Sequence, residues 1–166
     1  MRYITAPWRT DYVRNVQTTK GCVLCRALKA PDDREASILY RGAHSFVILN
    51  KFPYVSGHVM IAPIAHRASY DRSSAALSAE ISDLLKTTIR ILKAAYRPQG
   101  FNVGMNLGRN AGAGVVDHYH IHIVPRWAGD ANFMPIVGGT KVMLEDLAAT
   151  YTHLRPLFDR ARGPKR

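Results

Sequence analysis

The sequence of 166 residues has little of three things: cysteine, long hydrophobic runs and acidic side chains. Its two cysteines, Cys22 and Cys25, are too few for the disulfide framework of a secreted protein. No stretch approaches the run of about eighteen apolar residues that a membrane-spanning helix requires. Residues 1–20 contain several charged side chains and no apolar segment of the kind found in signal peptides. We therefore expect an unprocessed cytoplasmic protein without a membrane partner.

The scarcity of acidic side chains leaves a strongly basic protein. Twelve Asp and Glu residues stand against 23 Lys and Arg, and the formal net charge is +11 at pH 7. Such a charge attracts anions, and both nucleic acid and a polyphosphate nucleotide are candidate partners. The sequence contains no recognised nucleic-acid motif and no aromatic and basic strand pair that stacks bases, so nucleic acid is the less favoured partner.

Length and hydrophobic period predict one α+β domain. Runs rich in β-branched and aromatic residues predict strands over 37–41 and 45–50, joined by a turn, and over 59–62 and 101–106. The helical period of 74–96 predicts a long helix that begins at a serine N-cap and stops at Pro98-Gln99-Gly100.

The two ends of the chain give weaker signals. Residues 142–158 predict a second helix, with Pro156 near its end. Residues 1–20 have no clear period and predict an extended arm, with Trp8 and Tyr12 as docking points. The basic tail 161–166 is more typical of a solvated end than of a binding arm.

The most informative stretch is 117–126, where His118, His120 and His122 alternate with hydrophobic residues. Alternate residues of a strand face the same side, so the spacing predicts a row of imidazoles on one face. One interpretation is a surface strand that carries histidines by chance. The other is a catalytic or metal-binding strand, because imidazole acts as nucleophile, acid, base or ligand near neutral pH.

The run His118-Tyr119-His120-Ile121-His122-Ile123-Val124 resembles the signature of the histidine-triad (HIT) superfamily of nucleotide hydrolases and transferases. Residues 6–9, 106–108, 112–114 and 125–135 extend the resemblance to the bacterial branch that contains diadenosine tetraphosphate hydrolases and phosphorylases. The resemblance covers roughly residues 6–155. It implies an antiparallel sheet of about five strands with one long helix packed on it and a C-terminal helix. It also implies a homodimer, with the HIT domain at 21–160.

The resemblance assigns roles to residues of the predicted site. His120 is expected to be the nucleophile that forms a nucleotidyl intermediate, and His122 to bind the phosphoryl oxygen or neutralise the leaving group. Asn50 is expected to bind the ribose hydroxyls, and the alternative interpretation is an Asn that starts a turn before Pro53. The nucleotide-binding residues implied by the resemblance are Asn50, Asn106, Gly112, Gly114 and His122.

The C-x-x-C pair has three interpretations: a redox dithiol, a free pair or half of a zinc site. A thioredoxin-like pair needs a βαβ context that the sequence does not show. The resemblance implies a structural zinc held by Cys22, Cys25, His66 and His118, with no position open for water. The alternative is that both cysteines are reduced and that His66 is a surface loop residue.

The predicted function is cleavage of a diadenosine polyphosphate, such as diadenosine tetraphosphate, with water or phosphate as the acceptor of the nucleotidyl group. One alternative is a nucleoside phosphoramidate hydrolase, and another is a nucleic-acid-binding module without catalysis. His58 is expected to be a strand histidine without a chemical role, because the sequence pairs it with no other group. Lys141 is either a phosphate contact or a solvated residue at the start of the second helix.

Overall fold

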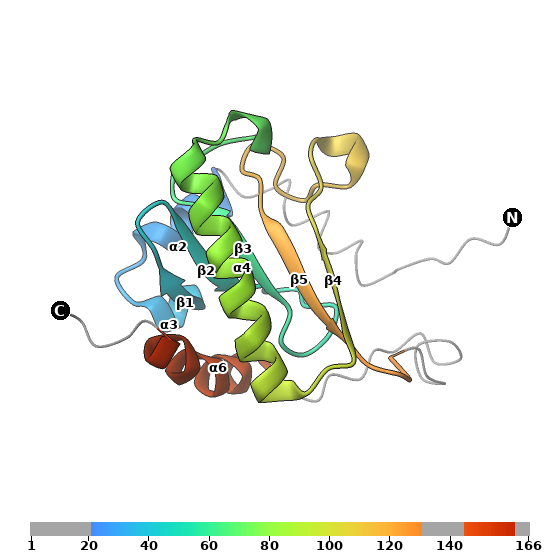
Figure 1. The fold of residues 1–166 in the computed structure, drawn as a ribbon. Helices are drawn as coiled ribbons and strands as arrows, with labels where there is room; N and C mark the ends of the chain where they lie inside the picture. Colours follow the sequence, from blue (N-terminus) through green and yellow to red (C-terminus); the bar gives the residue numbers. More distant parts are fainter. Residues whose placement is uncertain (1–20, 131–144, 162–166) are drawn as a thin grey trace, which may run out of the picture.

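The fold is organised around one antiparallel sheet (Figure 1). The computed structural model describes residues 21–130 and 145–161, so Trp8, Tyr12, Lys141 and residues 162–166 lie outside the described part of the chain. The five strands are arranged in the order β1-β2-β3-β5-β4, and every neighbouring pair is antiparallel. The strands are β1 (Ile38–Arg41), β2 (Ser45–Leu49), β3 (Val59–Pro63), β4 (Gly100–Gly104) and β5 (Ile121–Arg126).

The predicted hairpin is confirmed: β1 and β2 pair on either side of a tight turn at Gly42. Glu80 of the long helix stabilises this turn. Its carboxylate accepts hydrogen bonds from the backbone N–H groups of His44 and Ser45 at 2.9 and 3.1 Å, and from the Ser45 hydroxyl at 2.9 Å. A Cβ atom at Gly42 would overlap this carboxylate and lie 2.9 Å from the backbone oxygen of Ser45, so a side chain there would displace Glu80 from the turn.

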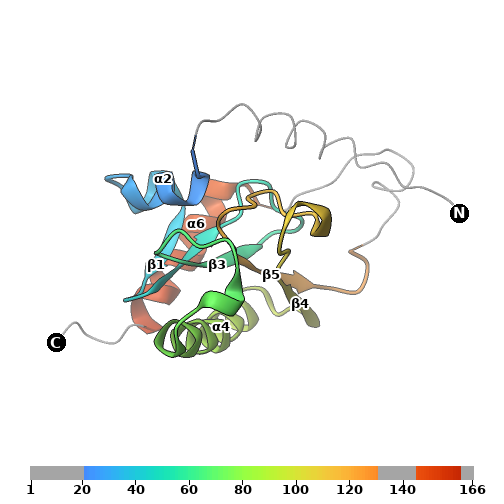
Figure 2. The ribbon, with the colours of Figure 1, turned by 90° about the horizontal axis from the view of Figure 1, so that it is seen from above.

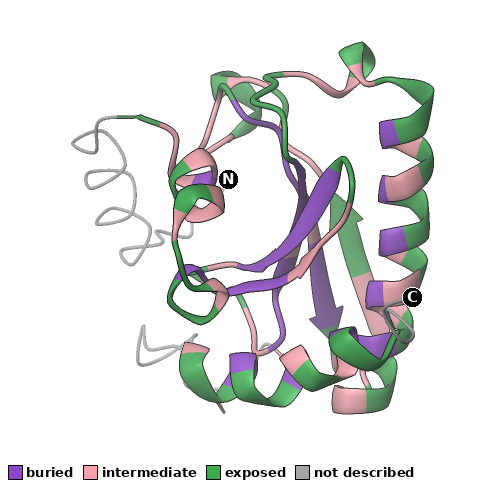
Figure 3. Cartoon of the chain, turned by 90° about the vertical axis from the view of Figure 1, so that its left-hand side faces the viewer, coloured by how far each residue is buried: buried purple, intermediate pink, exposed green. Residues whose placement is uncertain are grey.

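The predicted long helix is α4 (Ala75–Tyr96). Ser74 is its N-cap, with the hydroxyl accepting from the N–H of Leu77 at 3.3 Å, and Arg97 ends it in the left-handed conformation. Its apolar stripe packs on one face of the sheet beside α6 (Leu147–Ala161), as Figures 1 and 3 show. The buried residues of α4 are Leu77, Ile81, Leu84, Thr88, Ile91 and Leu92.

Helix α6 has different bounds from the predicted second helix. It begins at Leu147 because Asp146 caps it: the Asp146 carboxylate accepts from the N–H of Ala149 at 2.7 Å. Pro156 lies inside the helix rather than near its end, because the helix continues to Ala161.

The short helix α2 (Val23–Lys29) lies on the other face of the sheet from α4 (Figure 2), and a second short helix, α3 (Asp33–Ala36), precedes β1. Leu24 is the buried residue of α2, and it packs with Ala36, Ile38 and Ile48 in a second core. The sequence did not predict these helices, because seven residues and four residues are too short for a helical period to be recognised. No helix within 21–130 and 145–161 has the length and apolar character needed to cross a bilayer.

Candidate active site and metal centre

The alternation of the histidine segment is retained, although the segment is not one strand. Strand β5 begins at Ile121, so His118 and His120 precede it, and the prediction of a histidine strand over the whole triad is wrong. The reason is that the N–H of Tyr119 donates to the carbonyl of Arg67, in a loop outside the sheet. The backbone nevertheless remains extended enough for alternate side chains to separate.

The two sides of this segment have different surroundings. Tyr119 is buried in the core beneath α4, and its hydroxyl lies 2.7 Å from that of Ser73. His120 and His122 line a cavity of about 820 Å³ on the opposite side of the sheet, with ring centroids 4.8 Å apart. The cavity lies beside α2, the loop after β2 and the turn before the histidines. It brings together all the predicted nucleotide-binding residues, Asn50, Asn106, Gly112, Gly114 and His122.

The protonation of His120 is decided by one hydrogen bond. Its Nδ1 lies 3.0 Å from the carbonyl oxygen of His118, and a carbonyl oxygen only accepts. The Nδ1 therefore carries the proton, and Nε2 has a free lone pair. His120 is 6% exposed, and burial lowers the pKa of its imidazole against the opposing effect of this hydrogen bond. The ring is therefore neutral at pH 7.

His58 has a partner that the sequence analysis missed. Its Nε2 lies 3.0 Å from Nδ1 of His122, and its Nδ1 accepts from the N–H of Tyr54 at 3.1 Å. Because a backbone N–H only donates, His58 carries its proton on Nε2 and donates it to His122. Neutral His122 then carries its own proton on Nε2. The expectation that His58 has no chemical role is therefore corrected.

A signal for this pair was present in the alternation of β3. Met60 pairs with His122 across β3 and β5, and His58 lies two residues before Met60, on the same side of the chain. The strand order and register were needed to bring the two histidines together. The sequence alone specified neither.

The backbone before His58 is held by a close contact. Gly57 has a φ of +74°, and a Cβ atom there would lie 2.9 Å from Cε2 of Tyr96. Tyr96 is anchored in turn, because its hydroxyl donates to the Glu145 carboxylate at 2.8 Å. Contact with the Tyr96 ring thus positions the peptide that leads into His58.

Asn50 serves as a turn residue in this structure. Its side-chain oxygen accepts from the N–H of Phe52 at 3.0 Å, and its Nδ2 lies 3.4 Å from Nδ1 of His58. The turn interpretation therefore holds, and the same side chain lines the cavity. On the other side of the cavity, Nδ2 of Asn106 donates to the carbonyl of Gly112 at 3.4 Å, next to the short 3-10 helix η2 (Arg109–Ala111).

Both cysteines and two histidines come together beside the triad. Cys22 Sγ lies 3.3 Å from Nδ1 of His118, and Cys25 Sγ lies 3.3 Å from Nδ1 of His66 and 3.5 Å from that of His118. The four ligand atoms all lie within 4.8 Å of one another. In a tetrahedral zinc site the ligand atoms are about 3.3–3.8 Å apart, so the chemistry and spacing of these residues fit zinc.

The ring of His118 is oriented for a metal. Its Nε2 donates to the carbonyl oxygen of Pro63 at 2.8 Å, which leaves the Nδ1 lone pair directed toward the two sulfurs. Burial lowers the pKa of His118, which favours the neutral form that a metal requires. The sequence therefore predicted a group of residues that the fold brings together from α2, the loop after β3 and the triad.

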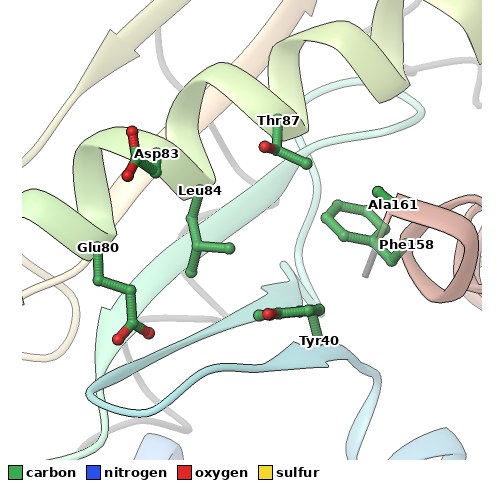
Figure 4. Close-up of a pocket in the computed structure, with 7 residues that line it drawn as sticks. All are labelled: Tyr40, Glu80, Asp83, Leu84, Thr87, Phe158 and Ala161. Atoms are coloured by element: carbon green, nitrogen blue, oxygen red, sulfur yellow. The ribbon is translucent and has the colours of Figure 1, made fainter. Parts of the chain in front are cut away.

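A second cavity, of about 420 Å³, lies on the opposite face between α4, β1 and α6 (Figure 4). Its side chains include Glu80, Asp83 and Tyr40, and the Glu80 carboxylate already caps the β1–β2 turn. No histidine or cysteine lines it. The cavity beside the triad is therefore the candidate active site.

Comparison with known proteins agrees with this geometry. A family model described as the HIT domain matches residues 32–129. The chain belongs to the HIT domain family. This HIT domain is 42% identical over 118 residues to an AP-4-A phosphorylase of Mycobacterium tuberculosis, which covers 71% of this chain and 60% of the relative. The chain thus spans about three fifths of that relative's length. The predicted family is confirmed.

Solved structures confirm the predicted α+β fold. A hypothetical histidine triad nucleotide-binding protein from Sulfolobus tokodaii superimposes with a TM-score of 0.67 at 26% identity, over 85% of this chain and 94% of the other. A zinc-bound histidine triad family protein from Mycobacterium smegmatis gives a TM-score of 0.66 at 22% identity, over 87% of this chain and 98% of the other. The second of these supports the fold alone.

Gly57→Ala tests the contact that positions His58. We expect this HIT domain to lose about 2–3 kcal/mol of unfolding free energy. Two costs add up: the strain of an alanine in the left-handed conformation and the steric clash of its Cβ atom with Tyr96. Gly129→Ala is the matched control: Gly129 has a φ of +90° but no neighbouring atom within 4 Å, so only the backbone strain of about 1 kcal/mol applies. Urea denaturation measures both. Equal losses would remove the Tyr96 contact from the explanation.

Proposed function

We propose that this HIT domain cleaves a dinucleoside polyphosphate, with diadenosine tetraphosphate as the first candidate, through a nucleotidyl intermediate on His120. The supporting observation is the neutral His120 ring with an unprotonated Nε2, beside His122 in the 820 Å³ cavity. The name of the Mycobacterium tuberculosis relative, AP-4-A phosphorylase, supports this class of substrate. The net charge of +11 favours a polyanionic substrate.

The first step of the proposed reaction uses both histidines of the cavity. The Nε2 lone pair of His120 attacks the α-phosphorus, a nitrogen–phosphorus bond forms, and the bond from phosphorus to the bridging oxygen breaks. The leaving nucleotide takes the proton from Nε2 of His122. His58 holds His122 in the tautomer that has this proton, through the 3.0 Å hydrogen bond to its Nδ1.

The second step releases the nucleotidyl group. Water or inorganic phosphate attacks the same phosphorus and gives up a proton to Nε2 of His122, and the nitrogen–phosphorus bond breaks to restore neutral His120. We propose that Asn50 binds the ribose, and that Asn106 with the backbone of Gly112 and Gly114 binds the phosphates, because all four line the cavity with the histidines.

His120→Asn tests the nucleophile. Incubation of diadenosine tetraphosphate with excess phosphate should give ADP plus ATP if phosphate is the acceptor, or AMP plus ATP if water is. The variant should be slower by about 10⁴-fold or more while it still binds nucleotide, because the covalent route is lost. His44→Asn, at an exposed histidine of the β1–β2 turn, is the control and should retain full activity. An unchanged rate in His120→Asn would exclude the covalent route, and cleavage of a phosphoramidate alone would favour the alternative hydrolase.

We propose that Cys22, Cys25, His66 and His118 hold a structural zinc ion. When bound, zinc supplies a cross-link between α2 and the triad and no reactive water, since four protein ligands fill its coordination. The pair of free cysteines suits a reducing compartment, and we propose the cytoplasm. We also propose that the domain extends over 21–160, between an arm at 1–20 and a basic tail at 161–166.

Metal analysis of the purified protein tests the zinc site. We expect about one zinc per chain, and a loss of zinc in Cys25→Ser and His66→Asn. The melting temperature should fall by about 5 °C or more, the shift that about 2 kcal/mol produces at this chain length. His44→Asn is again the control. A wild-type protein free of zinc, or variants that keep both metal and melting temperature, would contradict the assignment.

We infer that the protein is a homodimer that forms through the β4 edge of the sheet. Among residues 21–130 and 145–161, strand β4 pairs with β5 and with no strand on its other side, and its residue Val103 is 43% exposed. Val103→Lys should convert the dimer to a monomer in sedimentation velocity, because two copies of the new charge would meet at a symmetric interface. Ile64→Lys, at another exposed apolar residue, should not. A monomeric wild-type protein would refute the dimer.

A further inference from the structure

The cavity extends away from the triad along a row of side chains that crosses the sheet. His122 is paired with Met60 across β5 and β3, and Met60 with Ile48 across β3 and β2. All three line the cavity. Adjacent strands lie about 4.8 Å apart, so Ile48 is about 10 Å from the histidine strand. The distance from the α-phosphorus of a nucleotide to its base is comparable. A nucleotide with this phosphorus at His120 would therefore place its base near Ile48.

The far end of the row is an apolar wall of the cavity. It is formed by Leu24 and Ala27 of α2 with Ala36 and Ile48, which pack together in the second core and line the cavity. Leu24 and Ala36 belong to the buried core beneath α2, so their side chains are fixed by packing. A flat aromatic base can pack against such a wall, and polar groups beside it can then read the identity of the base.

Two groups of opposite charge lie at this edge. Arg26 belongs to α2, next to Ala27, and Glu35 belongs to α3, next to Ala36, and both line the cavity. Both residues are exposed. Within the described part of the chain, neither side chain forms an ion pair or a hydrogen bond with another residue. The ionised Glu35 carboxylate can only accept hydrogen bonds, and the Arg26 guanidinium can only donate them.

We propose that Glu35 and Arg26 determine the base specificity of the site by reading one edge of adenine. Glu35 accepts a hydrogen bond from the N6 amino group, and Arg26 donates one to N7. Adenine presents this donor and acceptor side by side, whereas a 6-oxo purine presents two acceptors there and directs its O6 at the Glu35 carboxylate. The proposal rests on the proposed function and adds to it the two residues that select the base.

Calorimetric binding of AMP and IMP tests the Glu35 contact without turnover. Wild-type protein should bind AMP about tenfold more tightly than IMP, because one good base contact at a partly exposed site discriminates by about that factor. Glu35→Gln should abolish the preference, since its amide can donate to O6. Asp83→Asn, which removes an exposed carboxylate of α4 on the opposite face of the sheet, should keep it.

A second pair of ligands tests Arg26. Wild-type protein should prefer AMP to 7-deaza-AMP, and Arg26→Leu should remove that preference, because the replaced ring atom is the acceptor that Arg26 contacts. Equal binding of AMP and IMP to the wild type, or an unchanged preference in Glu35→Gln, would overturn the proposal. Tighter binding of GMP than AMP would also overturn it, in favour of Glu35 pairing with the N1–H and N2 amino groups of guanine.

These results separate the base specificity from the reaction. If AMP is preferred as expected but diadenosine tetraphosphate is not cleaved, the proposed reaction fails and the specificity proposal stands. If diadenosine tetraphosphate is cleaved but Glu35→Gln still prefers AMP to IMP as the wild type does, the reaction stands and the specificity proposal fails. If no nucleotide binds, both fail.

Discussion

The hydrogen bond from Nδ1 of His120 to the carbonyl of His118 is the interaction on which the chemistry of the site depends. It is 3.0 Å long and joins two residues that are only two positions apart, so it needs no long-range contact to form. It leaves Nε2 of His120 unprotonated in the cavity. Burial lowers the pKa of the same ring and outweighs the opposing effect of this hydrogen bond, so burial favours the neutral form while the hydrogen bond selects its tautomer.

The sheet determines which face of the molecule His120 and its neighbours lie on. Alternation places Tyr119 in the core beneath α4 and the neighbouring histidines on the α2 side. A shift of the chain by one residue would exchange these faces and bury imidazoles in an apolar core. The large core beneath α4 and α6 therefore fixes the orientation of the triad, although none of its helices contributes a residue to the site.

Much of this arrangement was predictable because it follows from local patterns. The β1–β2 hairpin and α4 have periods and caps that the sequence displays directly, and the triad has its alternation. The His58–His122 pair was not predictable in this way, because it depends on the register between β3 and β5. Helix α2 was missed for a different reason: it is too short to show a period, and its stability comes from the burial of Leu24.

Helix α2 connects the parts of the site that the sequence analysis treated separately. Cys22 and Cys25, at and within its first turn, approach His66 and His118, while Leu24, Arg26 and Ala27 of the same helix line the cavity. A helix of seven residues with one fully buried side chain has little stability of its own. Its position is therefore determined by its contacts with the rest of the fold: the burial of Leu24 and, at the N-terminal end, the Cys and His cluster. A displacement of α2 would change the distances from the two cysteine sulfurs to His66 and His118 and the shape of the cavity together, because residues 22–27 contribute to both.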